Sequence, residues 1–248
     1  MSEEYGKKEN KALSAPEWST LRPKSFEQIL GESPYKSPTD MGVNMAGNCI
    51  IDNDVTCKAA RDEIIRRYYV GLCDYKKGLI AEDELIKLEL LMKQANVTPD
   101  DRKVVAAALA REEQTGGPAA AMELPDGTIL TGKTSNLLGA VSALLLNALK
   151  YLAGLDEEIL LMSPQVIEPI QDLKVRHLGN NNPRIHTDET LLALSICANS
   201  DENAKKAMEQ IANLRGCEVH STVILSAVDE RIFKRLGINL TCEPKYSN

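Results

Sequence analysis

The residues that come nearest to a known chemical motif run from Gly127 to Thr134. Their spacing, Gly-x-x-x-x-Gly-Lys-Thr, is that of a P-loop, whose backbone N–H groups wrap phosphates while the lysine meets the outer phosphates. The intervening residues Thr-Ile-Leu-Thr favour a strand over a flexible loop, and Asp126-Gly127 favours a hairpin turn. We therefore interpret the segment as a β-hairpin that leads into a helix. An anion can still bind at the start of that helix, at Lys133, Thr134, Ser135 and Asn136.

Two histidines are candidates for proton transfer. His186 lies in a polar loop with Arg184, directly before the helix-opening sequence Thr-Asp-Glu-Thr. It is either a ligand-facing group or a contact to the helix cap. His220 precedes Ser and Thr at the start of an apolar strand, and neither a Gly-x-Ser-x-Gly nor a His-Glu-x-x-His motif occurs. His186 and His220 are therefore candidate catalytic residues, and Arg184 is a candidate ligand-binding residue.

A further group of candidate ligand-binding residues lies in a loop rich in Gly, Ser, Pro and Asn, residues 26–56. Such a segment is either a surface connection or a binding loop presented by a rigid scaffold. The polar side chains of interest are Lys36, Asp40, Asn44 and Asn48.

The six cysteines do not have the spacing of a metal site. No Cys-x-x-Cys pair occurs, and no histidine lies three or four residues from a cysteine, as zinc sites usually require. The chain is long and rich in core residues, and its amino-terminal sequence does not resemble a secretory signal. We therefore expect reduced thiols in a cytoplasmic protein without a bound metal, and the sequence identifies no cofactor.

The overall composition excludes several classes of partner. The chain has 29 Lys+Arg against 36 Asp+Glu and a net charge of -7, which argues against a nucleic-acid or anionic membrane surface. The longest uncharged apolar stretch, Thr134–Leu149, is shorter than the ~20 residues that span a bilayer. The expected partners are a small molecule and either a second copy or a partner domain.

Hydrophobic periodicity predicts an α/β fold in four parts. Residues 1–25 are a polar arm that we expect to be disordered, and residues 26–56 are the loop described above. Residues 57–117 form a three-helix unit, and residues 118–246 form a mixed-sheet α/β domain.

Within the α/β domain, a hairpin is followed by alternating helices and strands. Strands are expected at 119–124, 128–132, 158–162, 218–225 and 238–243. Helices are expected at 135–153, 164–178 and 228–236, and directly after Thr187 and Asp201. The helix over 135–153 is apolar almost all round, so it must be covered on several sides.

Several segments closely resemble the bacterial domain of unknown function 1846 family. They include GESPYKSPTDMGVNMAGNCI, EIIRRYY, PAAAMELPDG, SPQVIEPIQ, HTDETLLALS and HSTVILSAVDE. The resemblance runs from about Phe26 to Tyr246 and is assigned to the carboxyl-terminal half of the family. It implies an uncharacterised cytosolic protein whose relatives are about twice as long and carry a glycine-rich, nucleotide-type loop in their amino-terminal half. A peptidase label sometimes attached to that family has no support in these residues.

The order of elements from Ala119 onward is also similar to the cytidine-deaminase-like fold. A zinc deaminase needs a His or Cys with a Glu at the first helix and a Cys pair at the second. These places read Asn136-Leu-Leu and Pro164-Gln-Val-Ile, so the zinc chemistry is absent. Relatives of this fold that work without zinc imply that a small-molecule site can remain.

Two functions from different classes follow. The first is a zinc-free domain that binds or converts a small anionic metabolite or nucleotide at the residues named above. The second is a non-catalytic assembly module that packs against a nucleotide-binding amino-terminal half or against another copy.

Overall fold

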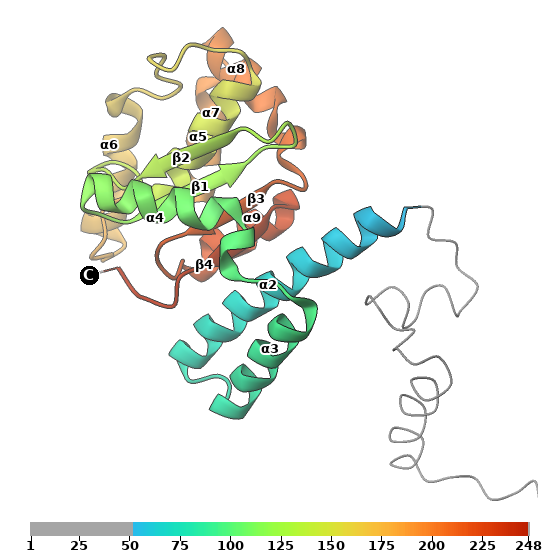
Figure 1. The fold of residues 1–248 in the computed structure, drawn as a ribbon. Helices are drawn as coiled ribbons and strands as arrows, with labels where there is room; N and C mark the ends of the chain where they lie inside the picture. The colour runs from blue at the N-terminus through green and yellow to red at the C-terminus, as the bar shows by residue number, and fades with distance from the viewer. Residues whose placement is uncertain (1–51, 248) are drawn as a thin grey trace, which may run out of the picture. The chain divides into compact units, whose positions relative to one another are not determined.

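The computed structural model describes residues 52–247, which form a mixed α/β structure around a four-stranded sheet (Figure 1). The strands are β1 (Ala119–Glu123), β2 (Ile129–Lys133), β3 (Glu218–Ser221) and β4 (Asn239–Cys242). Their order is β2-β1-β3-β4, with β1 antiparallel to both neighbours and β3 parallel to β4. The predicted α/β class with a mixed sheet is confirmed, whereas the comparison with the cytidine-deaminase-like fold is not.

Helices cover both faces of this sheet. Helix α5 (Ala140–Leu152) lies on one face, and α4 (Lys103–Thr115) lies on the other (Figure 1). Alternation along the strands divides the side chains accordingly, because neighbouring residues point to opposite faces. Met122 and Val219 join the core on the α5 side, whereas Ala121 packs with Val104 and Ala108 of α4.

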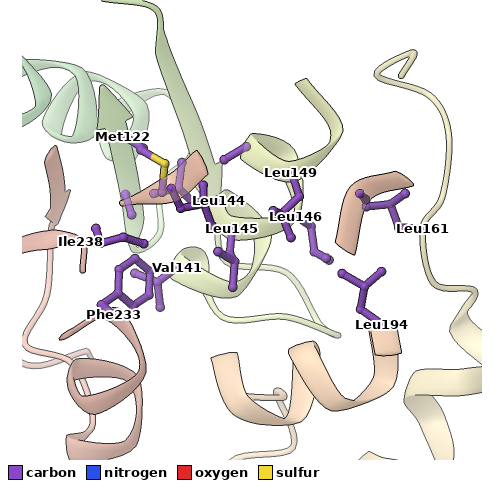
Figure 2. Close-up of a cluster of buried hydrophobic side chains, with 14 of the residues drawn as sticks. Met122, Val141, Leu144, Leu145, Leu146, Leu149, Leu161, Leu194, Phe233 and Ile238 are labelled. Atoms are coloured by element: carbon purple, nitrogen blue, oxygen red, sulfur yellow. The ribbon is translucent and has the colours of Figure 1, made fainter. Parts of the chain in front are cut away.

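The main core gathers around α5, as its apolar surface requires. Helices α7 (Thr187–Cys197), α8 (Glu202–Glu209) and α9 (Ala227–Leu236) complete its cover. Leu144 of α5 is fully buried, and Phe233 of α9 and Leu194 of α7 belong to the same cluster (Figure 2). The predicted buried helix is confirmed. Among the described residues, no helix is long and apolar enough to cross a membrane.

A helical hairpin precedes α4 in the chain. It consists of α2 (Asn53–Lys77), whose start is capped by the Asp52 carboxylate, and α3 (Glu82–Ala95). The two helices approach closely at Gly71, where an added Cβ would lie 2.4 Å from Leu88 Cδ1. The helices predicted over 57–114 all form, and the last of them packs on the sheet.

Four predicted elements differ from the structure, three of them as follows. Residues 158–162 form turns, because Asp156 accepts a hydrogen bond from the Glu158 N–H and Leu160 is 70% exposed. Strand β3 ends at Ser221, whose hydroxyl bonds both the N–H and the carbonyl of Val223 and turns the chain. The third difference is that α5 begins at Ala140, since residues 134–139 form a loop.

Helix 164–178 is also divided in the structure. It consists of α6 (Pro164–Asp172) followed by a π-helical turn, η2 (Leu173–His177).

The residues with P-loop-like spacing form a β-hairpin in the structure. Gly127 lies in the hairpin turn with φ +84°, and the residues from Ile129 to Lys133 are strand β2. A Cβ on Gly132 would lie 2.4 Å from Leu144 N and 2.5 Å from Ala140 O. Gly132 therefore permits α5 to pack against the strand, and the interpretation as a hairpin is confirmed.

Replacing Gly132 should weaken the fold measurably. We expect Gly132→Ala to lower the free energy of unfolding by about 1–3 kcal/mol, because the methyl group meets backbone atoms that cannot move aside easily. Urea denaturation followed by circular dichroism measures this loss. The matched control is Gly117→Ala, where no atom lies within 4 Å of the added Cβ. Equal stabilities of the two variants would contradict the packing argument.

Candidate functional site

The candidate site is built around the short segment Arg184–Thr187, whose backbone is held at every polar group. The Ile185 N–H bonds the carbonyl of Leu137, and the Ile185 carbonyl accepts from Ser142. The remaining groups are held by the Asn182, Lys174, Glu189, Thr190 and Asp229 side chains. A segment fixed in this way presents its side chains in one geometry, as a preorganised site requires.

Asp229 is the anchor of this arrangement. Its side chain is 6% exposed, and its two oxygens accept from the Thr187 N–H and hydroxyl, from the Ser226 hydroxyl and from the His186 ring. Burial by itself raises the pKa of Asp229, but these hydrogen bonds outweigh it and lower the pKa to about 2. Asp229 is therefore a carboxylate at neutral pH.

His186 is oriented by this carboxylate. The distance from His186 Nδ1 to Asp229 Oδ2 is 3.0 Å, so Nδ1 carries the proton and donates it in this bond. The hydrogen bond to Asp229 raises the pKa of His186, although partial burial acts against it. The side chain is 30% exposed. Because Nδ1 carries the proton of the bond to Asp229, Nε2 is the nitrogen that takes up a proton when the ring becomes charged.

A second ion pair supports the same segment from the other side. Lys174 of the π-helical turn is almost fully buried, and its Nζ lies 2.7 Å from Glu189 Oε2 and 2.7 Å from the Arg184 carbonyl. Glu189 also accepts from the His186 N–H. A buried pair of this kind contributes little net stability, but the removal of one partner leaves an uncompensated charge. Its role here is to fix the backbone that carries His186.

The structure brings the predicted anion-binding residues to the same edge. Arg184 Nε donates to the carbonyl of Ser135 at 2.9 Å, and Leu138 pairs with Ile185. Lys133 and Asn136 are exposed, and Thr134 is half-buried with its N–H bonded to the Pro118 carbonyl. The Ser135 hydroxyl accepts from the N–H groups of residues 137 and 138. The Arg184–Ser135 and Leu138–Ile185 contacts thus bring the two segments together, and we call Lys133–Asn136, Arg184 and His186 the polar edge.

His220 does not belong to this edge. Its side chain is fully buried on the α4 side of the sheet, with Nδ1 2.9 Å from Thr241 Oγ1 and Nε2 3.1 Å from Glu243 Oε1. Tyr69 of α2 packs edge-to-face against its ring. Burial lowers the pKa of His220, although Glu243 acts in the opposite direction. The expectation that His186 and His220 line one site therefore does not hold in this geometry.

The remaining predicted residues can be placed as follows. Lys36, Asp40, Asn44 and Asn48 lie outside the described residues, as does the predicted polar arm. Within residues 52–247, no group of three or more His, Cys, Asp or Glu side chains could hold a metal ion, and Cys73, Cys197, Cys217 and Cys242 are free thiols.

Sequence reasoning missed the residues that support His186. Asp229 and Ser226 form a local signal, since a serine three residues before an aspartate is typical of a helix start. That signal indicates a cap and gives no reason to connect the aspartate with His186. Lys174 lies on an amphipathic helix, where a lysine is ordinarily solvent-exposed.

His186 and His220 should have pKa values on opposite sides of 6.5, the usual pKa of a histidine. We expect His186 to titrate above it, because Asp229 stabilises the charged ring, and His220 below it, because burial disfavours that form. The chain has only 3 histidines, so carbon-detected NMR resolves each ring, and His177→Gln identifies the third resonance. A His186 pKa at or below 6.5 would contradict the hydrogen bond between His186 and the Asp229 carboxylate.

Removing the Asp229 charge should affect both stability and protonation. We expect Asp229→Asn to reduce the free energy of unfolding by about 2 kcal/mol, because two donors then face an amide NH2. His186 should lose its raised pKa and change tautomer, which nitrogen-15 shifts report. In the parent protein, the stabilisation from the His186–Asp229 pair is complete below pH 6.5 and is lost as pH rises through the raised pKa of His186.

The control for that variant is Asp201→Asn, in which the amide oxygen can keep the cap of α8. Its stability should change little. If Asp229→Asn is equally mild and leaves the His186 pKa unchanged, Asp229 is not the anchor of the site.

Comparison with known proteins places this chain in a family. The profile described as "Domain of unknown function DUF1846, C-terminal" matches residues 100–248, and the one described as "Domain of unknown function DUF1846, N-terminal" matches residues 17–96. The match therefore extends beyond the carboxyl-terminal half to which the sequence resemblance was assigned.

Three relatives named UPF0371 proteins illustrate the similarity. The relative from Corynebacterium urealyticum is 54% identical over 89% of this chain and 44% of its own length. The relative from Corynebacterium efficiens is 51% identical over 98% of this chain and 49% of its own length. One from Streptococcus thermophilus is 51% identical over 89% of this chain and 45% of its own length. The chain thus spans about half the length of the curated relatives it matches, and it belongs to the uncharacterised DUF1846 (UPF0371) family.

Proposed function

We propose that this chain binds a small anionic metabolite at the edge formed by Lys133–Asn136, Arg184 and His186, with His186 as the proton-carrying group. The observation that carries the proposal is the fixed His186–Asp229 pair, in which a buried carboxylate orients a partly exposed imidazole. Such a pair is the usual way in which proteins prepare a histidine for proton transfer near neutral pH.

The charges of the edge support an anionic ligand. The Asp229 carboxylate is hydrogen-bonded to the His186 ring, and the Glu189 carboxylate is paired with the Lys174 ammonium. Lys133 is exposed, and Arg184 uses its Nε for Ser135, while its terminal nitrogens have no hydrogen bond to any residue of 52–247. An arginine in that state suits a phosphate or carboxylate, to which it can donate two parallel hydrogen bonds.

The chemistry available at this edge is acid–base chemistry. Among the described residues, no serine, threonine or cysteine side chain has a hydrogen bond to His186 Nε2, so the pair lacks the nucleophile of a hydrolase triad. A ligand held by Arg184 and Lys133 would place an acidic or basic group beside Nε2. The proposal includes the analogy to zinc-free members of the cytidine-deaminase-like fold, which the hairpin followed by a buried helix supports.

The proposal is tested with inorganic phosphate and adenosine monophosphate as probes. Each should shift the His186 ring resonance and raise the melting temperature, by an amount that corresponds to about 2.7 kcal/mol at a hundredfold excess over the dissociation constant. His186→Gln and Lys133→Ala should each weaken binding about tenfold or more. The matched control is His177→Gln, which changes an exposed histidine at the end of the π-helical turn.

Two outcomes would reject this function. The first is that neither probe binds at millimolar concentration. The second is that both probes bind equally well to the parent protein and to the His186 and Lys133 variants. The second result would place the ligand at a different surface.

A further inference from the structure

The largest cavity of the described residues lies along the helical hairpin, on a different part of the molecule from the His186 site. It is a groove of about 1240 Å³ that is lined by helices α2, α3 and α9 and by strand β4. None of the residues of the polar edge lines it. Pockets for small molecules typically occupy ~300–1,000 Å³, so the groove is larger than a small metabolite needs.

The contacts of helix α2 show which kind of segment the groove can take. On one side Gly71 of α2 packs against Leu88 of α3, and on another the Cys73 thiol donates to the Cys242 carbonyl of β4 at 3.3 Å. Tyr69 lies on a third side, in the core. The groove is the side of α2 that remains, between α3 and the pair of β4 and α9. Because α2 covers the Cys242 end of β4, a strand cannot pair along that edge, whereas a helix can lie on the open side of α2.

The volume of the groove corresponds to a short helix. An α-helix about 10 Å across rises 1.5 Å per residue, so each residue fills roughly 120 Å³. A groove of about 1240 Å³ therefore takes about ten helical residues, close to three turns. Helix α3 has 14 residues and is long enough to fill such a groove.

The middle of the groove is apolar and open. Val70 of α2 and Leu90 of α3 are 51% and 50% exposed, and the half-buried Leu91 also lines the groove. Leu85 and Met92 of α3 are buried. Helix α3 thus carries apolar residues beyond the side that faces the core, as a helix with a second helical neighbour does.

The charges that line the groove include three without an ion-pair partner among residues 52–247. Asp74 and Glu84 belong to the hairpin, whereas Lys234 belongs to α9. Lys77 pairs with Glu230 at 3.4 Å and so joins the end of α2 to α9. Since Glu84 lies in the first turn of α3, directly after that end of α2, the unpaired Glu84 and Lys234 lie at the same end of the groove on opposite walls.

Opposite charges on opposite walls fit a second copy of the same chain. A twofold axis parallel to the groove places α3 of each copy on α2 of the other, so that the two hairpins form a four-helix bundle. Every contact at such an interface occurs twice, with the two residues exchanged between the copies. Glu84 of each copy then approaches Lys234 of the other, and the exposed Val70 and Leu90 become enclosed.

We infer that the chain forms a symmetric dimer in which helix α3 of each copy fills the groove of the other. The inference is independent of the anion site. It gives the assembly function a specific surface, at which the chain packs against another copy of itself.

Sedimentation equilibrium and light scattering of the whole chain test this dimer. We expect the mass to rise with protein concentration to twice that of one chain. Leu90→Asp should weaken association about tenfold or more, because it encloses a charge in the apolar middle of the bundle. Leu192→Asp changes a 65% exposed leucine of α7, outside the groove, and should leave the dissociation constant unchanged. Both variants are first compared with the parent protein by thermal unfolding.

Charge reversal tests the position of α3 in the groove. Lys234→Glu should weaken association about fivefold at low salt, because it brings like charges together twice in each dimer. Glu84→Lys should have the same effect, and the double variant should restore the dissociation constant of the parent protein. The matched control is Lys206→Glu, which changes an exposed lysine of α8 outside the groove and should have no effect.

Three results would overturn the inference. The first is a protein that remains monomeric at millimolar concentration. The second is a dimer that persists in Leu90→Asp or dissociates in Leu192→Asp, because the interface then lies on a different surface. The third is a double charge variant that associates more weakly than either single variant, because α3 then does not lie against α9.

Discussion

The close packing of α5 against β2 is the constraint on which the rest of the structure depends. Helix α5 is apolar on nearly all sides, so it has to be covered by the sheet and by further helices at once. Gly132 permits the approach, because any side chain there would meet the backbone of residues 140 and 144. Helices α7, α8 and α9 then complete the cover, and Figure 2 shows Leu194 of α7 and Phe233 of α9 in this core.

The two faces of the sheet use polar residues in different ways. On the α4 side, Arg102 donates to Thr241 and to the carbonyls of Val219 and Asn239, and it pairs with Glu218. Arg66 of α2 pairs with the same glutamate at 2.9 Å. These contacts connect the helical hairpin to the sheet and enclose His220. The Nε, Nη1 and Nη2 atoms of Arg102 each have a partner among the described residues, as a structural role requires.

On the other side, the polar network ends in a partly exposed group. The contacts of Asp229, Lys174 and Glu189 all converge on the segment that carries His186. The His186 side chain is 30% exposed, whereas the His220 side chain is fully buried.

The local elements of this protein can be predicted from its sequence alone. The hairpin at Asp126-Gly127, the buried character of α5 and the helix start after His186 all follow from turn preferences, hydrophobic periodicity and capping residues, which act over a few positions. The strand predicted at 158–162 was wrong, because an apolar run resembles a strand whether or not a neighbour is present to pair with it.

Which polar side chains lie in contact depends on the tertiary structure. Asp229 lies 43 residues from His186 along the chain, and no local pattern connects the two. His220 and His186 looked equivalent in the sequence, yet the alternation of β3 directs the first into a closed core while the start of α7 presents the second at an open edge. The pKa and accessibility of a histidine depend on its surroundings in space, so the fold decided their roles.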